Sequence, residues 1–149
     1  MTSASDPSRR HRRRRERGFT LIELLVVLAI LGLLAGLVAP RVLDYFSRAK
    51  TDTARLQVEN LSAALDLFRL DVGRYPTSQE GIVSLAARPA GLGTWRGPYV
   101  KGAGVPADPW GRPYQYRMPG TDGRPYDLFS LGADGAPGGE GENTDVMAR

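Results

Sequence analysis

Residues 18–40 read GFTLIELLVVLAILGLLAGLVAP, and this stretch decides the fold. From Phe19 to Ala39 it is apolar apart from Thr20, Glu23 and glycines. An α-helix of about 20 such residues is roughly 30 Å long, which matches the hydrocarbon core of a bilayer. The stretch therefore predicts one membrane-spanning helix near the N-terminus.

The charges around this stretch predict its orientation. Residues 1–18 hold seven arginines against Asp6 and Glu16, a net charge of +5, whereas the remaining residues hold 13 basic and 14 acidic side chains. Because basic flanks stay in the cytoplasm, we expect the residues after Pro40 on the opposite side. A nucleic-acid-binding arm has a similar composition, but direct connection to a membrane span argues against it, so no nucleic-acid partner is expected.

Glu23 is an ionisable residue at the start of an apolar helix. A charge at the bilayer centre costs about 2.5–3.5 kcal/mol on insertion scales, and acids within a membrane usually have a partner. No Lys or Arg occurs between Phe19 and Pro40, so the partner must come from elsewhere. A cut between Gly18 and Phe19 would create a new α-amino group four residues before Glu23.

The stretch RGFTLIELLVVLAILGLLAGLVAP resembles the prepilin signal of type IV pilins and type II secretion pseudopilins. This resemblance implies that Gly18 precedes the cleavage site of the prepilin peptidase and that Phe19 becomes an N-methylated terminus. It also implies that Glu23 pairs with the Phe19 amine of a neighbouring subunit and thereby sets the register of assembly.

The residues after Pro40 predict a continuation of the helix to about Val72. One face carries an apolar stripe with spacings of three and four residues, which is typical of a helix packed on a core. The stripe consists of Ala54, Val58, Leu61, Leu65, Phe68 and Val72. Gly73 is expected to end the helix, and Pro76 prevents its continuation.

The following segments predict a small mixed body. Thr77 and Glu80 have the spacing of a capping box, which predicts a short helix over about 78–87 that buries Ile82, Val83 and Leu85. Residues 114–118 and 126–131 predict an antiparallel hairpin, after a loop over 90–108. The predicted fold class is α+β, a long N-terminal helix packed on a small antiparallel sheet.

The acidic loop, residues 131–146, reads LGADGAPGGEGENTDV and contains five glycines. Ca²⁺ takes about six to eight oxygen ligands, and glycines allow backbone carbonyls to join carboxylates. The loop is not an EF-hand, because Ala136 and Gly138 would occupy the third and fifth ligand positions after Asp134. Composition alone leaves a solvated acidic tail and a metal site equally open.

The segments GRYPTSQEGI, WRGPYV, DPWGRPYQY and YDLFSLGADGAPGGEGENTDV resemble the major pseudopilin family of type II secretion, the general secretion pathway protein G family. The resemblance covers residues 18–146. It implies a type IV pilin-like fold and a structural Ca²⁺ bound by the side chains of Asp134 and Asp145 and the carbonyl of Leu131. The implied function is that of the major structural subunit of a pseudopilus, a periplasmic filament that drives export of folded proteins across the outer membrane.

This resemblance also implies the domains, partners and localisation. The domains are a cleaved basic leader over 1–18, a transmembrane and filament-core helix over 19–40, and a periplasmic domain over 41–149. Within the last, 41–72 is helix, 77–88 a short helix and 109–149 the sheet and calcium loop. The expected partners are further copies of this chain, minor pseudopilins, the prepilin peptidase/N-methyltransferase, the inner-membrane assembly platform and, before assembly, membrane lipid. The expected localisation is the bacterial inner membrane as a single-pass protein with a cytoplasmic N-terminus, and the periplasmic pseudopilus after assembly.

Three other functional classes share part of this pattern or must be excluded by it. A type IV or competence-type pilin subunit shares the prepilin signal, but many type IV pilins carry a C-terminal disulfide loop and this chain has no Cys. A membrane-anchored calcium-binding module that never polymerises would need neither Glu23 nor the cleavage site. An enzyme is not expected, because the only histidine is His11 in the leader and catalysis based on His or Cys is thereby excluded from the mature chain.

Overall fold

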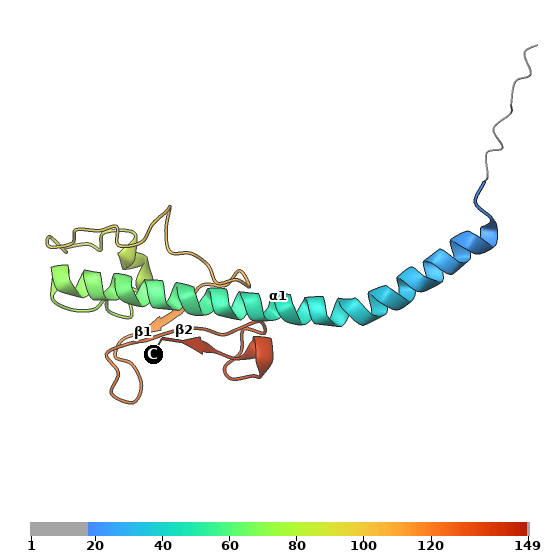
Figure 1. Ribbon diagram of the computed structural model, residues 1–149. Coiled ribbons are helices and arrows are strands. Elements are labelled where there is room, and N and C mark those ends of the chain that lie inside the picture. The colour runs from blue at the N-terminus through green and yellow to red at the C-terminus, as the bar shows by residue number, and fades with distance from the viewer. Residues whose placement is uncertain (1–17, 149) are drawn as a thin grey trace, which may run out of the picture. The chain divides into compact units, whose positions relative to one another are not determined.

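The structure is a computed structural model that describes residues 18–148 (Figure 1). The predicted leader lies outside the described residues except for Gly18, and so does Arg149. The chain divides after Pro40 into two compact units, the second of which begins at Arg41. After the helix, the second unit contains in order η1 (Ile82–Leu85), β1 (Gln115–Arg117), β2 (Asp127–Ser130), η2 (Gly141–Asn143) and β3 (Val146–Met147).

The helix α1 spans Leu21–Val72 and remains helical through Pro40. Gly73 follows it with a φ of 85°, a conformation that favours glycine, and its amide donates to the carbonyl of Arg69 at 2.8 Å. The predicted end of the helix at Gly73 is therefore confirmed.

The second half of α1 supplies most of the core of the body. Ala54, Val58, Leu61, Leu65 and Phe68 of the predicted stripe are buried, and Val72 packs on the same cluster while partly exposed. From the rest of the chain the cluster receives Tyr75, Ile82, Leu85, Tyr114, Leu128 and Val146. The predicted packing of the helix stripe on the C-terminal body is confirmed.

The segment after Pro76 differs from the predicted short helix. The capping box forms, since the amide of Glu80 donates to Thr77 Oγ1 at 3.2 Å and the amide of Thr77 donates to Glu80 Oε2 at 2.8 Å. Gly81, however, has φ 59° and ψ −178°, which interrupts a helical path, and only a 3₁₀ turn, η1 (Ile82–Leu85), follows. The helix predicted over 78–87 is wrong in its length and type. Ile82 and Leu85 are buried as predicted, whereas Val83 is exposed.

The sheet has three short antiparallel strands in the order β1-β2-β3. β1 (Gln115–Arg117) pairs with β2 (Asp127–Ser130), as predicted for the hairpin. β2 also pairs with β3 (Val146–Met147), which the sequence did not predict. Figure 1 shows this sheet beside the second half of α1, so the predicted α+β arrangement is confirmed.

Three tyrosines of the body attach it to polar side chains of α1. Tyr75 donates its hydroxyl to Asp66 at 2.8 Å, and Tyr99 donates to Asp71 at 2.9 Å. Tyr114 donates in the same way to Gln57. Each ring packs on or within the apolar core while its hydroxyl finds a partner at the rim.

Asp127 is a buried carboxylate at the start of β2, only 1% exposed. It accepts a hydrogen bond from Arg117 Nη2 at 2.6 Å and one from the amide of Thr121 at 2.9 Å, and Arg124 Nη2 lies 3.3 Å away. The bond from Arg117 is the main reason that the pKa of Asp127 falls from its usual 3.8 to about 2, with smaller contributions from Thr121 and Arg124.

We expect this carboxylate to make the body sensitive to acid. Its pKa is lower in the folded than in the unfolded chain, so its stabilising contribution is complete above pH 3.8 and is lost as the pH falls to about 2. Melting temperatures of the full chain in detergent, measured against pH, should fall less steeply over this range for Asp127→Asn than for the wild type. Asp122→Asn, at an exposed position, should keep the wild-type slope. Equal slopes for Asp127→Asn and the wild type would contradict this assignment.

Candidate functional site

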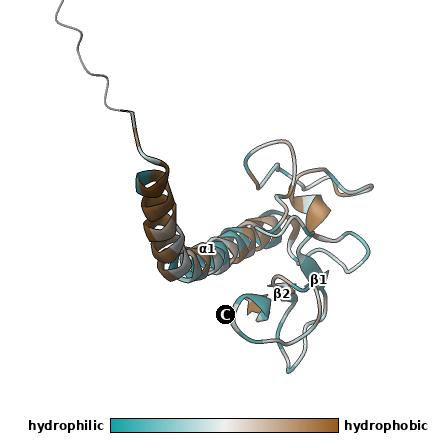
Figure 2. Cartoon of the chain, turned by 90° about the vertical axis from the view of Figure 1, so that its right-hand side faces the viewer, coloured by the Kyte–Doolittle hydropathy of each residue, from teal (hydrophilic) through white to brown (hydrophobic). Residues whose placement is uncertain are grey.

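The first half of α1 exposes its apolar side chains on every side. Large side chains from Leu21 to Val38 are all exposed within the isolated chain. Figure 2 shows hydrophobic residues concentrated along this part of the helix. Among residues 18–148, α1 is the one helix long and apolar enough to cross a membrane by length and composition. Such a surface requires lipid or other apolar helices around it.

Glu23 lies in the first turn of α1 and is hydrogen-bonded to Thr20. The amide and hydroxyl of Thr20 donate to Glu23 Oε2 at 2.8 and 3.1 Å, and the amide of Glu23 donates to Thr20 Oγ1 at 3.2 Å. Thr20 therefore caps the helix in a reciprocal capping box. These donors are neutral, so they satisfy hydrogen bonds of the carboxylate without balancing its charge.

This capping box was missed in the sequence, although Thr20 and Glu23 have the same Thr-x-x-Glu spacing as Thr77 and Glu80. Gly18 and Phe19 precede the cap in non-helical backbone, and the Phe19 side chain is exposed. The structure thus places the predicted cleavage site in an accessible segment next to the predicted assembly residue.

The acidic loop connects β2 to β3. Gly132, directly after Leu131, has a φ of 63°, and a Cβ there would lie 2.8 Å from backbone atoms of Glu142 and Asn143. The amide of Ala133 donates to the carbonyl of Glu142 at 2.9 Å. The two ends of the loop are therefore in contact, and only glycine permits this approach at position 132.

The two aspartates of the predicted cation site both lie in this loop. Asp134 Oδ1 accepts a hydrogen bond from the amide of Ala136, and Asp145 Oδ2 accepts one from the amide of Gly138, each at 3.0 Å. Asp145 Oδ1 is buried and has no hydrogen-bond partner among the described residues. A buried carboxylate oxygen without a donor is costly, and a hard cation is the partner that such an oxygen prefers.

The donor set fits a cation that is bound in part by backbone oxygens. No group of three His, Cys, Asp or Glu side chains that could hold a metal occurs in the part of the chain that the structure describes. A cation in this loop must therefore add carbonyl ligands to its carboxylates, which the glycine-rich backbone can provide. No hydrogen bond between described residues links Asp134 to Asp145 directly.

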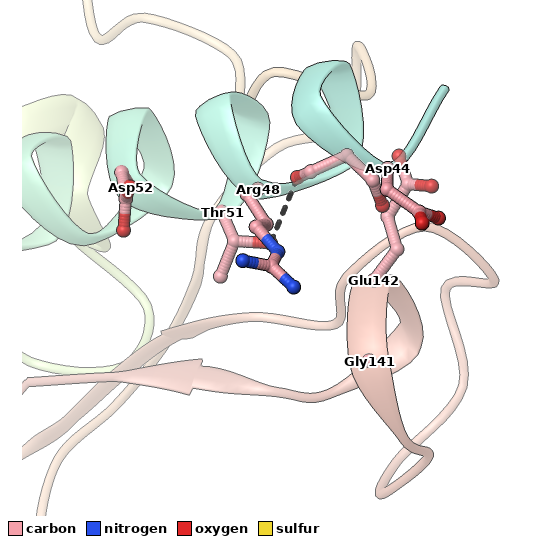
Figure 3. Close-up of a pocket in the computed structure, with 7 residues that line it drawn as sticks. Asp44, Arg48, Thr51, Asp52, Gly141 and Glu142 are labelled. Atoms are coloured by element: carbon pink, nitrogen blue, oxygen red, sulfur yellow. Dashed lines mark hydrogen bonds between the residues drawn. The ribbon is translucent and has the colours of Figure 1, made fainter. Parts of the chain in front are cut away.

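Glu142 attaches the loop to the rest of the body. It lies in η2 (Gly141–Asn143), accepts a hydrogen bond from Trp110 Nε1 at 2.9 Å, and has Lys50 Nζ at 3.8 Å. The pKa of Glu142 is lowered by the bond from Trp110 first and by Ser47 and Lys50 next. Figure 3 shows Glu142 facing a turn of α1 that carries Asp44, with Arg48 and Thr51 on the next turn. No sequence pattern links Trp110 to Glu142, which are 32 positions apart.

Two family patterns match this chain and together cover most of it. The family described as "Type II secretion system (T2SS), protein G" matches residues 41–149, and the "Prokaryotic N-terminal methylation motif" matches residues 13–39. The second match contains Gly18, Phe19 and Glu23.

Curated relatives and a solved structure point to the same family. The chain is 46% identical over 138 residues to the type II secretion system core protein G of Pseudomonas aeruginosa, covering 90% of this chain and 95% of the relative. It is 41% identical to the protein of the same name from Vibrio cholerae, covering 89% and 91%. The crystal structure of the major pseudopilin from the type 2 secretion system of enterohaemorrhagic Escherichia coli is similar with a TM-score of 0.56 and 33% identity, covering 67% of this chain and 86% of that one.

Proposed function

Because this chain belongs to the type II secretion system protein G family, we propose that it is the major structural subunit of a pseudopilus and polymerises through the first half of α1. The single observation that carries this proposal is the first half of α1, which exposes apolar side chains on every side and has an acid in its first turn. The filament forms in the periplasm and drives export of folded proteins across the outer membrane.

The surface of the half-helix suits close packing between copies. Ala29, Gly32, Ala35 and Gly36 are small, and a Cβ built on either glycine would meet no atom within 4 Å apart from its chain neighbours and the adjacent backbone of its own helix. Small residues allow helix backbones to approach closely where lipid or other helices surround them. Head-to-tail contacts that do not close into a ring generate a helical filament.

Glu23 sets the register of these contacts. When α1 leaves the membrane for the filament interior, the carboxylate remains in apolar surroundings and requires a positive charge. The Phe19 amine that cleavage after Gly18 exposes on an adjacent copy supplies this charge. Thr20 holds the carboxylate at the helix terminus, where that amine reaches it.

The second half of α1 offers a further surface to neighbouring copies. Leu56, Ala63, Leu67 and Leu70 are exposed and lie on the face opposite the buried stripe, because they are offset from it by about half a helical turn. A patch at Val42, Tyr45 and Phe46 is also exposed. The buried face of this helix packs on its own body, and the exposed apolar face contacts other subunits.

The acidic loop holds a structural Ca²⁺ through the side chains of Asp134 and Asp145 and the carbonyl of Leu131. The unpartnered Oδ1 of Asp145 supports this assignment. When bound, the cation neutralises the carboxylates and cross-links the loop. The residues of this chain fix the two ends of the loop through the contact between Ala133 and Glu142.

Membership of the family supports the remaining assignments of this proposal. The chain spans the inner membrane once, with its N-terminus in the cytoplasm and its body in the periplasm. Its partners are further copies of itself, minor pseudopilins, the prepilin peptidase/N-methyltransferase and the assembly platform. It has a structural and not a catalytic role.

Mass spectrometry of the chain extracted from a host with a prepilin peptidase tests the proposal. We expect a mature chain that begins at Phe19 and carries one methyl group. Gly18→Leu should leave the leader attached and prevent filament formation, while Gly32→Ala, inside the membrane segment, should be processed normally. A wild-type chain that keeps residues 1–18 in such a host would contradict polymerisation and favour a simple membrane anchor.

A further inference from the structure

The turn formed by residues 108–112, DPWGR, is organised by the buried side chain of Asp108. Asp108 Oδ1 accepts hydrogen bonds from the amides of Trp110 at 3.1 Å and Arg112 at 2.8 Å. Asp108 Oδ2 accepts one from the hydroxyl of Ser130, the last residue of β2. The turn is therefore fixed against the strand from which the acidic loop departs.

Arg112 holds the start of the acidic loop. Two nitrogens of its guanidinium donate to the carbonyls of Gly132 and Ala133. Gly135 lies directly against the same side chain, because a Cβ at that position would be 2.8 Å from Arg112 Nε. The planar guanidinium can serve two carbonyls at once, which a lysine ammonium does with far less geometric constraint.

Trp110 holds the far end of the loop. Its Nε1 donates to the Glu142 carboxylate at 2.9 Å, while the carbonyl of Glu142 accepts from the amide of Ala133 at 2.9 Å. Glu142 is thus joined to the turn by its side chain and to the start of the loop by its backbone. One turn of five residues contacts both ends of the loop.

We propose that the turn 108–112 is a positioning element that arranges the acidic loop for its cation before the cation binds. This inference rests on the proposed Ca²⁺ site. Arg112 fixes the backbone next to Leu131 and Asp134, and Trp110 fixes the backbone that leads to Asp145. The carbonyls of Gly132 and Ala133 accept from the Arg112 guanidinium, whose positive charge disfavours a cation at the same oxygens. Mutation of residues that orient metal ligands in this way typically lowers metal affinity by about 10–100-fold.

Because Arg112 is positively charged, a positioning role and a purely electrostatic role predict opposite changes in Ca²⁺ affinity when it is replaced. A guanidinium close to the site repels Ca²⁺, so its removal by Arg112→Gln would strengthen binding if charge alone mattered. A positioning role requires the opposite, a weaker affinity in spite of the lost repulsion.

The test combines amide hydrogen exchange with Ca²⁺ titration calorimetry on the full chain in detergent. In the presence of chelator, Arg112→Gln should accelerate exchange at about residues 132–136. Trp110→Phe, which keeps an aromatic ring but loses the indole donor, should accelerate exchange at about residues 141–145. Both variants should raise the Kd for Ca²⁺ by about tenfold or more. Arg96→Gln, at an exposed arginine, should change neither quantity.

The outcomes separate this inference from the site on which it rests. A wild-type chain that takes up no Ca²⁺ refutes the cation site, whereas the exchange data in chelator still decide whether the turn holds the loop. Unchanged loop exchange in both variants, a lower Kd for Arg112→Gln, or faster exchange that extends to the core of α1 over 54–68 would each overturn the positioning role.

Discussion

Replacement of Glu23 by leucine is expected to abolish filament formation while membrane insertion and the folded body remain intact. The removal of one partner from a buried charge pair costs about 3–5 kcal/mol, which corresponds to a loss of about a hundredfold or more in association constant at each contact. Filament yield can be measured by electron microscopy of sheared material, and insertion by membrane fractionation. A normal filament yield from this variant would refute the proposed pairing between Glu23 and the Phe19 amine.

Two further variants separate the charge of Glu23 from its local hydrogen bonds. Glu23→Gln can still accept from Thr20 but carries no charge, so it should be as defective as the leucine variant. Thr20→Val removes the hydroxyl and leaves the acid, at a cost of about 1 kcal/mol in helix capping, and should still form filaments. If Glu23→Gln assembles and Thr20→Val does not, the residue acts through the helix cap and not through a neighbouring amine.

Addition of Ca²⁺ to the metal-stripped full chain is expected to raise its melting temperature substantially. A ligand at a hundredfold excess over its Kd stabilises the folded state by about 2.7 kcal/mol. For a body of this size such a gain corresponds to a shift on the order of 10 °C. Differential scanning calorimetry in detergent measures it directly, and a stripped wild-type chain that shows no shift would refute the cation site.

Matched substitutions locate the effect in the acidic loop. Asp145→Asn retains the shape of the side chain but removes the charge at the oxygen without a partner, so most of the gain from Ca²⁺ should be lost. Asp134→Ala should reduce the gain as well. Asp122→Asn, an exposed position outside the loop, should retain it in full. Equal gains for Asp145→Asn and Asp122→Asn would place the cation elsewhere.

The features that the sequence predicted are those with a local signal. The buried stripe from Ala54 to Phe68 follows helical periodicity, Gly73 is a glycine where a positive φ is needed, and the first strand of the hairpin alternates in burial. The capping box of Thr20 and Glu23 has an equally local signal in its Thr-x-x-Glu spacing, which the charge of Glu23 alone does not reveal.

The features that escaped prediction depend on contacts between distant residues or on single backbone conformations. β3 has two residues, too few for any periodicity, and exists because β2 offers it an edge. The capping box before Gly81 signalled the start of a helix, but the positive φ of Gly81 ended it at once. The contact between Trp110 and Glu142 joins segments 32 positions apart and leaves no local trace.

The tyrosine contacts between the body and α1 have a mechanical consequence. Their partners, Gln57, Asp66 and Asp71, are distributed over about 20 Å of the helix. A force that pulls the helix along its axis therefore loads these bonds and the core beneath them together in shear, instead of opening them one at a time. The body therefore moves with its helix as one unit when the helix is under axial force, as each subunit of the proposed filament must.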